Sequence, residues 1–186
     1  MWTATVFDTE TPGFKQDGIM QLAAVVIDAD FKVIGKFNSL IKPEFYGEVE
    51  EGAFAAHGIT KEKCEAHGIP LIAALGMLSN FIKTTDVAIC HNYSYDSRVV
   101  AKCLELLGKE NFLLRRRTFC TMEATTNLCK LPGKYGKFKW PKLQEAHKFL
   151  FGHEFESAHD ALADVEATVR ILQELKAKYP ELLSRV

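Results

Sequence analysis

The N-terminal segment constrains the fold most, because it combines the periodicity of a strand with a carboxylate at its end. Residues 2–8 (WTATVFD) follow the two-residue alternation of a β-strand, and the run closes on Asp8. Two more strand-like segments cover residues 21–28 and 33–41, and Asp28-Ala29-Asp30 between them has the composition of a turn. The sequence therefore predicts that an antiparallel meander opens the fold.

The rest of the chain reads as helices that alternate with short strands. Helical spacing of apolar residues is found at 71–82, 95–107, 122–129, 141–151 and 160–178. Short runs at 87–90 and 113–120 predict two more strands, the first of them buried and parallel. Residues 43–70 are predicted to be rich in loops. This order predicts a mixed α/β sheet covered by helices, and the length of 186 residues fits one domain, 1–186.

Composition narrows the class of protein. Hydrophobic residues make up 47% and charged residues 25% of the chain, which is typical of a globular protein. No apolar stretch approaches the roughly 18 residues of a membrane span. The five cysteines are odd in number and include no close pair, which indicates reduced thiols rather than a disulfide framework or a zinc site. We expect a soluble, cytoplasmic protein without a membrane partner.

Acidic residues interrupt the apolar patterns at the ends of several elements. Asp8 and Glu10 have the same parity, so both side chains point to one side of the first strand. Asp96 lies on the inward stripe of its helix, and Asp164 lies at the edge of the apolar face of the last helix. Buried carboxylates are costly unless they are paired or bound to a metal. Each one alone fits an acidic turn or a partly exposed helix residue, but four from three distant segments predict a shared site.

The chemistry of this residue set favours hard divalent cations. Oxygen ligands without a chelating Cys or His pair favour Mg²⁺ or Mn²⁺ over zinc. Two such ions about 4 Å apart would stabilise the attacking and leaving oxygens of phosphoryl transfer. His159 stands just before the last helix, five residues before Asp164, and histidine is a residue type suited to general-base catalysis. For a histidine by itself, a surface or capping role is the alternative.

A basic segment without acidic residues is a candidate for binding nucleic acid. Residues 124–144 contain no Asp or Glu, although the formal net charge of the whole chain is −1. The segment carries five lysines and three aromatic residues: Lys130, Lys134, Lys137, Lys139, Lys142, Tyr135, Phe138 and Trp140. Such a stretch can follow a phosphate backbone and stack on bases. A solvated loop is the alternative interpretation.

Three motifs in order resemble the DEDD family of 3′–5′ exonucleases, in its His-containing, DnaQ-like branch. Phe7-Asp8-Thr9-Glu10-Thr11 is similar to the first motif of that family, and the stretch from Cys90 to Asp96 (CHNYSYD) is similar to the second. His159 to Asp164 (HDALAD) matches the third motif, H-x4-D. Asp160 departs from the pattern, because a basic or small residue is expected after the histidine. The resemblance covers about residues 3–175.

The resemblance implies an RNase H-like fold, with a central mixed five-stranded sheet flanked by helices. It implies that two metal ions, Mg²⁺ or its substitute Mn²⁺, are bound by Asp8, Glu10, Asp96 and Asp164. It also implies His159 as the general base, and Thr11, His91 and Asn92 as residues that line the pocket for the terminal nucleotide. From the basic segment we add Lys134, Lys137 and Lys139 as expected strand-binding residues.

The expected function is a metal-dependent 3′–5′ exonuclease that hydrolyses terminal phosphodiesters of single-stranded DNA, or of frayed 3′ ends, and releases nucleoside 5′-monophosphates. DNA is favoured over RNA because the motifs look more like those of proofreading and repair members. One alternative is an exoribonuclease that trims RNA or degrades short oligoribonucleotides. Another is a non-catalytic subunit that binds strand ends within a polymerase or nuclease complex. Exposed helix faces also allow a homodimer.

Overall fold

The structure is a computed structural model that describes residues 2–15 and 17–183. The strands are β1 (Thr3–Glu10), β2 (Gln21–Asp28), β3 (Val33–Leu40), β4 (Val87–Cys90) and β5 (Arg117–Cys120). The α-helices are α1 (Glu51–His57), α2 (Lys61–His67), α3 (Leu71–Thr84), α4 (Tyr93–Leu106), α5 (Thr121–Cys129), α6 (Leu143–Phe151) and α7 (Ala161–Lys178). Two short 3₁₀ helices are η1 (Lys134–Gly136) and η2 (Pro180–Leu183).

The five strands form one mixed sheet in the order β3-β2-β1-β4-β5. The first three strands pair antiparallel, whereas β4 pairs parallel with both β1 and β5. The turn between β2 and β3 is stabilised by Asp28, whose Oδ1 accepts the backbone N–H groups of Asp30 and Lys32. The predicted antiparallel meander and the predicted buried parallel strand at 87–90 are thus confirmed.

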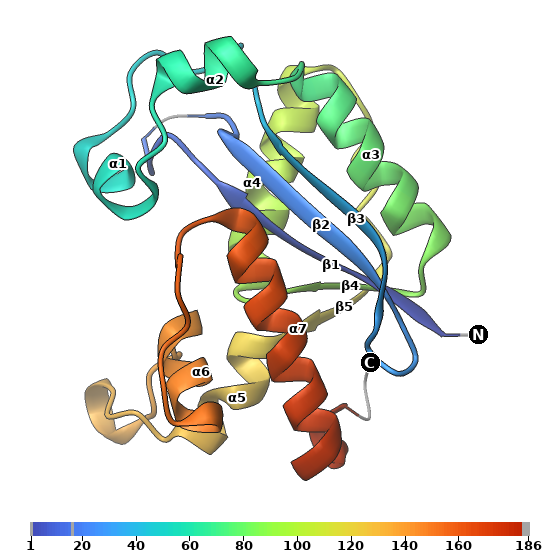
Figure 1. Ribbon diagram of the computed structural model, residues 1–186, viewed down its shortest axis with the longest axis vertical. Helices are drawn as coiled ribbons and strands as arrows, with labels where there is room; N and C mark the ends of the chain where they lie inside the picture. Colours follow the sequence, from blue (N-terminus) through green and yellow to red (C-terminus); the bar gives the residue numbers. More distant parts are fainter. Residues whose placement is uncertain (1, 16, 184–186) are drawn as a thin grey trace.

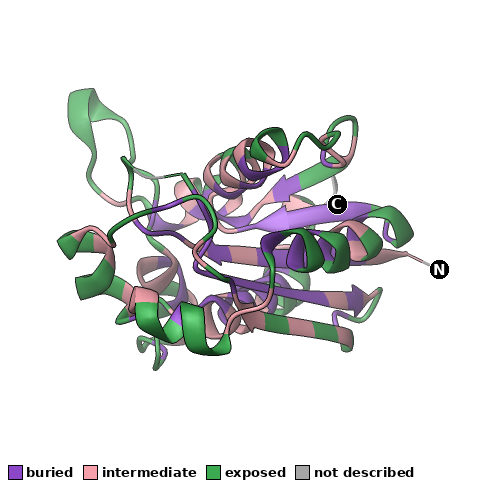
Figure 2. Cartoon of the chain, turned by 90° about the horizontal axis from the view of Figure 1, so that it is seen from above, coloured by how far each residue is buried: buried purple, intermediate pink, exposed green. Residues whose placement is uncertain are grey.

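Helices cover both faces of this sheet (Figure 1). Helices α3 and α4 pack on one face, where Phe7 contacts a core that includes Leu78 and Val100. Helix α7 packs on the other face, where Val6 contacts a core that includes Val165. Strands β1, β2 and β4 between these layers are largely buried, whereas β3 has no buried residue and β5 has one (Figure 2). The fold is therefore the mixed five-stranded sheet flanked by helices that the sequence predicted.

Successive residues of β1 face different helices, and this alternation positions the site. The even-numbered residues Ala4 and Val6 belong to the core under α7, so Asp8 and Glu10 share the side of α7. The odd-numbered Phe7 faces α3 and α4, so Thr9 shares the side of α4. The carboxyl end of β1 can therefore meet residues from the helices on both faces.

Several predicted boundaries were wrong. Residues 43–70 contain α1 and α2 rather than loops alone; α1 buries none of its residues and α2 buries only Cys64, so neither shows an apolar period. Helix α6 begins at Leu143 rather than at Pro141, because the Glu145 carboxylate accepts the backbone N–H of Lys142 and caps the helix there. The strand predicted at 113–120 is confined to β5.

The described residues also bear on the predictions from composition. All five cysteines are free, and four of them are buried, as expected for core thiols. Within residues 2–15 and 17–183, no helix combines the length and the apolar character that crossing a bilayer demands.

Gly68 provides a test of the packing between α2 and the sheet. A Cβ added there would lie 2.4 Å from the carbonyl oxygen of Cys64 and 2.7 Å from the backbone nitrogen of Lys42. We expect Gly68→Ala to lower the free energy of unfolding by about 1–3 kcal/mol in urea denaturation, because the backbone at Cys64 or Lys42 must move to make room for the new Cβ. Gly76, an exposed residue within α3 with open space around it, is the matched control, and Gly76→Ala should stabilise by about 0.5–1 kcal/mol. Equal effects at the two positions would contradict this assignment.

Candidate active site

Four carboxylates converge at the carboxyl end of β1 from three elements. Asp8 and Glu10 come from β1, Asp96 from the first turn of α4 and Asp164 from the first turn of α7. The charges of Asp96 and Asp164 both act on Asp8 and on Glu10, although they belong to helices on different faces of the sheet. The structure thus brings together the four acidic residues that the sequence singled out.

Thr9 holds Asp96 in this group. The backbone N–H and the hydroxyl of Thr9 both donate to Oδ1 of Asp96, at 3.0 and 2.8 Å. Asp96 is almost fully buried and forms no ion pair within residues 2–15 and 17–183, so these two bonds are what satisfies its Oδ1. Sequence reasoning missed this role of Thr9, although its parity in β1 placed it on the α4 side. The strand and the helix are thereby joined within the site.

The electrostatics of the group raise the pKa values of all four carboxyls. Burial, and then repulsion from Asp96, Asp164 and Glu10, raises the pKa of Asp8 well above its ordinary value. Burial, and then repulsion from Asp164, Asp96 and Asp160, raises the pKa of Glu10 to about 8. Burial raises the pKa of Asp164 to about 7; the N–H of His159 acts in the opposite direction, and the charge of Asp160 adds to the increase. Burial raises the pKa of Asp96 to about 7, although the bonds from Thr9 act in the opposite direction. Carboxylates buried together in this way favour a bound cation.

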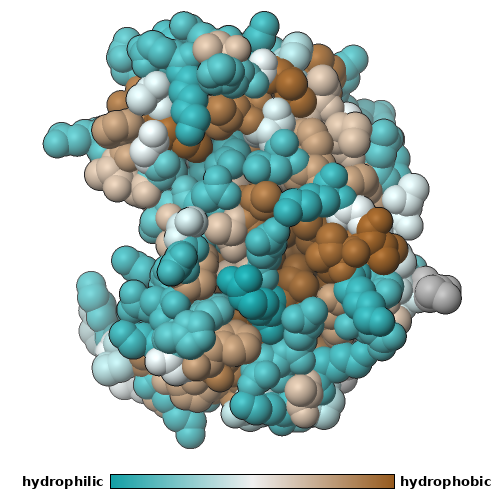
Figure 3. Space-filling view, viewed as in Figure 1, coloured by the Kyte–Doolittle hydropathy of each residue, from teal (hydrophilic) through white to brown (hydrophobic). Residues whose placement is uncertain are grey.

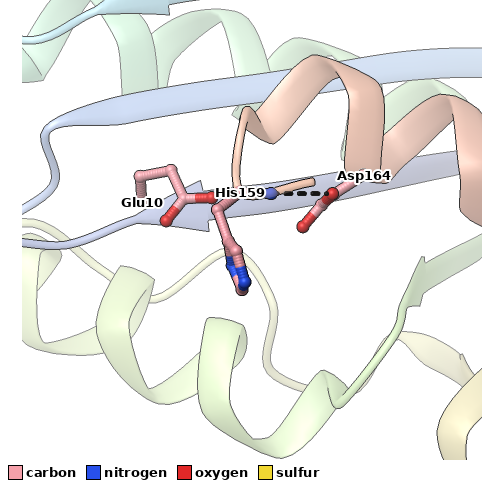
Figure 4. A group of neighbouring side chains, drawn as sticks. All are labelled: Glu10, His159 and Asp164. Atoms are coloured by element: carbon pink, nitrogen blue, oxygen red, sulfur yellow. Dashed lines mark hydrogen bonds between the residues drawn. The ribbon is translucent and has the colours of Figure 1, made fainter. Parts of the chain in front are cut away.

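His159, which is exposed, lies between Glu10 and Asp164 (Figure 4). One ring nitrogen of His159 and one carboxylate oxygen each from Glu10 and Asp164 lie within 4.8 Å of one another. The backbone N–H of His159 donates to Oδ1 of Asp164 at 3.3 Å, and its φ of 67° belongs to the left-handed region. The donor set, with oxygens in the majority and a single imidazole, fits hard divalent cations better than zinc.

Asp160, which departs from the expected motif, begins helix α7. Its Oδ1 accepts the backbone N–H groups of Leu162 and Ala163, each at 3.1 Å. Its other oxygen accepts from the side chain of Gln21, whose own carbonyl oxygen accepts the N–H of Ala161. This N-cap fixes the start of α7 against β2, and therefore the position of Asp164 one turn later.

The residues expected to line the nucleotide pocket have different surroundings. The Thr11 hydroxyl is hydrogen-bonded to the Tyr95 hydroxyl at 2.9 Å. Both ring nitrogens of His91 are engaged, with the Thr121 hydroxyl and the Pro141 carbonyl, and burial lowers the pKa of His91 to about 4. Asn92 adopts a left-handed conformation before α4. Of the three, Thr11 faces a cavity; contact of any of them with a nucleotide stays a prediction.

A cavity of about 390 Å³ opens beside Thr11. Phe14, which is 89% exposed, meets the Tyr95 ring edge to face at 6.0 Å. The guanidinium of Arg98 lies over the Tyr95 ring, 5.5 Å from its centre. Phe14 and Arg98 are further candidate residues that sequence reasoning missed; only the aromatic position before Asp96 gave a signal.

The three expected strand-binding lysines, Lys134, Lys137 and Lys139, lie apart from the carboxylates. They belong to a hairpin-like projection, residues 131–139, whose ends are joined by backbone hydrogen bonding of Lys139 to Leu131. Figure 1 shows this segment at the lower left, beyond α6. Tyr135 at its tip is 97% exposed. Lys139 forms an ion pair with Glu145 at 2.6 Å, so Lys134 and Lys137 are the better placed to meet a strand.

Comparison with known proteins decides the family. The family model described as exonuclease (RNase_T) matches residues 5–172. The chain belongs to this exonuclease family. The family member named "uncharacterized exonuclease CP81", from Escherichia phage 186, is 30% identical over 183 residues, which cover 90% of this chain and 85% of the relative. The prediction of an exonuclease of the DEDD group, a phosphodiester hydrolase, is thereby confirmed.

Solved structures of E. coli exonuclease I share the fold of this exonuclease. Its zinc-bound complex with single-stranded DNA matches with a TM-score of 0.83 at 23% identity, over 98% of this chain and 42% of exonuclease I. Its complex with a dT13 oligonucleotide also gives a TM-score of 0.83 at 23% identity, over 98% of this chain and 43% of the other. The present chain thus spans less than half the length of exonuclease I. The likeness confirms the RNase H-like fold.

The raised carboxylate pKa values predict how stability depends on pH without metal. In the unfolded chain these groups ionise near pH 4, whereas the pKa of Glu10 is about 8 and those of Asp96 and Asp164 are about 7 in the folded chain. Between these values the folded state retains protons that the unfolded state has released. The free energy of unfolding should therefore fall as the pH rises through this window.

The measurement is urea denaturation of the metal-free protein from about pH 6.5 to about pH 8. Because histidines of the unfolded chain also lose protons near pH 6.5, the contribution of the carboxylates is taken from the difference between the wild type and a carboxylate variant. Asp164→Asn should make the loss of stability smaller, because one repelling charge is removed. Saturating Mg²⁺ or Mn²⁺ should also make it smaller. Stability that is independent of pH without metal would contradict the electrostatic description.

Proposed function

We propose that this exonuclease removes nucleotides one at a time from the 3′ end of single-stranded DNA, or of frayed ends, and releases nucleoside 5′-monophosphates. The observation that carries the proposal is the convergence of Asp8, Glu10, Asp96 and Asp164 beside His159. We assign these four carboxylates as ligands of two Mg²⁺ ions, for which Mn²⁺ can substitute. We also propose that residues 1–186 form one exonuclease domain.

The chain's own residues supply the proton transfer and the positioning. Two divalent ions, when bound, supply positive charge that stabilises the attacking and leaving oxygens. His159 accepts the proton of the attacking water, and its exposed position leaves the ring free to pass that proton to solvent. The N–H of His159 donates to Asp164, so the base and one ligand have a fixed relative position. The two hydrogen bonds from Thr9 likewise fix the position of Asp96 relative to β1.

The surroundings of the site support a single strand as the substrate. Phe14 and Tyr95 offer aromatic surface for a base, and Arg98 offers a charge for a phosphate, in the cavity next to Thr11. Figure 3 shows the surface hollowed at its left edge, between the part that contains α1 and the part that contains α6. A strand that enters there would pass near the basic projection 131–139. DNA is proposed over RNA because the matched exonuclease I structures hold DNA oligonucleotides.

The test is a time course with 5′-labelled single-stranded DNA and RNA of the same sequence, with Mg²⁺, with Mn²⁺ and with EDTA. We expect a metal-dependent ladder that shortens from the 3′ end, with DNA the faster substrate. His159→Ala should lower the rate by about 10²- to 10⁴-fold, because a general base is lost. Asp164→Asn should lower it at least as much, with the fold retained.

Glu166→Gln is the matched control for Asp164→Asn, because Glu166 is an acidic residue of the same helix that pairs with Lys36. It should keep full activity. Full activity in Asp164→Asn would refute the ligand assignment. Faster cleavage of RNA would make the protein an exoribonuclease, and binding of strand ends without cleavage would make it the docking subunit of a larger complex.

The basic projection makes a separate prediction. Replacing Lys134, Lys137 and Lys139 with Ala should weaken strand binding and flatten its salt dependence, by a slope of up to about 2 for three lost phosphate contacts. Fluorescence anisotropy of a labelled oligonucleotide at several salt concentrations measures both. The control is the triple replacement of Lys83, Lys176 and Lys178, which lie at the ends of α3 and α7. An unchanged slope in the first variant would leave the projection as a solvated loop.

A further inference from the structure

The segment that carries His159 has few contacts of its own. Residues 152–159 connect α6 to α7, and Phe155 is the one buried residue among these eight, all of which the structure describes. Ser157 and His159 both have positive φ values, 59° and 67°. Such a segment does not hold a side chain in place by burial, so its position depends on a small number of anchors.

One anchor is a pair of hydrogen bonds from Gln144, in the first turn of α6. The side-chain amide nitrogen of Gln144 donates to the carbonyl oxygen of Phe155 at 2.7 Å. The N–H of Phe155 donates to the side-chain oxygen of Gln144 at 3.0 Å. The carboxamide thus pairs with both backbone groups of one residue, as a neighbouring strand would, and fixes the orientation of the backbone there as well as its position.

The Phe155 ring is held by a second set of contacts. It packs against His147 at 5.2 Å, and the guanidinium of Arg170 lies 5.9 Å from its centre. Nε of Arg170 donates to Nε2 of His147 at 3.4 Å, which requires that Nε2 is unprotonated. The proton of a neutral His147 is then on Nδ1, where it is donated to the carbonyl oxygen of His153 at 2.9 Å. His147 of α6 and Arg170 of α7 therefore hold His153 and Phe155 of the segment in place.

A short distance along the chain separates this anchor from the site. The N–H of Asp160 donates to the carbonyl of Ser157 at 3.1 Å, and Asp160 caps α7. His159 thus lies between a fixed Phe155 four residues before it and a fixed helix start immediately after it. Movement of Phe155 would be transmitted through Ser157 to the backbone of His159, whose N–H meets Asp164.

We propose that Gln144 is a positioning residue of this exonuclease: by holding the backbone of Phe155, it places the His159 ring for proton transfer. This proposal rests on the proposed function, in which His159 is the general base. Gln144 itself lies in α6, and among the described residues its side chain is hydrogen-bonded to Phe155 and not to the carboxylates or to His159. Its effect should therefore appear in the rate of the chemical step and not in the binding of the strand.

The experiment is a double-mutant cycle between Gln144 and His159, with single-turnover cleavage of labelled single-stranded DNA in Mg²⁺ as the readout. Gln144→Ala should lower the rate about 10- to 100-fold, since a misplacement of about 1 Å can cost that much, with strand affinity unchanged. In the His159→Ala background the same substitution should cost nothing further, because the group it positions is absent. Gln144→Glu keeps the acceptor for the Phe155 N–H and loses the donor, so it should give an intermediate loss.

The matched control is Gln173→Ala, which removes another amide-to-backbone hydrogen bond, from Gln173 to the carbonyl of Phe31 at 3.0 Å. It should leave the rate unchanged. Equal rate losses from Gln144→Ala in both backgrounds, or full activity in Gln144→Ala and Gln144→Glu, would overturn the positioning role. Full activity in His159→Ala would instead overturn the assignment of the general base, and the positioning role with it.

Discussion

Repulsion among four neighbouring carboxylates, one buried and three half-buried, is the constraint on which the rest of the structure depends. Asp8 and Glu10 are brought together by the parity of one strand, and burial of Val6 and Phe7 in opposite cores keeps that strand from slipping. The helices then add Asp96 and Asp164, each of which raises the pKa of the carboxyls on β1. Apolar packing on both faces of the sheet therefore holds together charges that would separate in its absence.

Two of the four acidic residues, Asp96 and Asp164, are held by contacts that are independent of any cation. Thr9 bonds Asp96, and the N-cap formed by Asp160 sets the first turn of α7, where Asp164 lies. In the proposed site these two carboxylates are therefore arranged before a cation binds, so binding would not have to order them. The site is also open on the side of His159, where the ring is exposed beside Glu10.

The fold and the acidic core of the site could be predicted because they depend on local periodicity and motif spacing. The alternation in β1 placed Asp8 and Glu10 on one side, and the apolar stripe of α7 placed Asp164 near its start. The short helices at 43–70 could not be predicted, since they bury almost nothing. Contacts between distant residues, such as Thr9 with Asp96 and Gln144 with Phe155, leave no periodic signal and required the structure.

The projection at residues 131–139 closes on itself, through the bonding of Lys139 to Leu131 and the pairing of Pro132 with Phe138. Gly133 is confined at its base, where a Cβ would lie 2.5 Å from the carbonyl oxygen of Lys137. The hydrogen bonds that close the projection lie within nine residues, and none of them involves a strand of the sheet. A segment of this kind behaves as an exchangeable module: its length and charge can change during evolution, or by design, while the carboxylates at the end of β1 keep their arrangement.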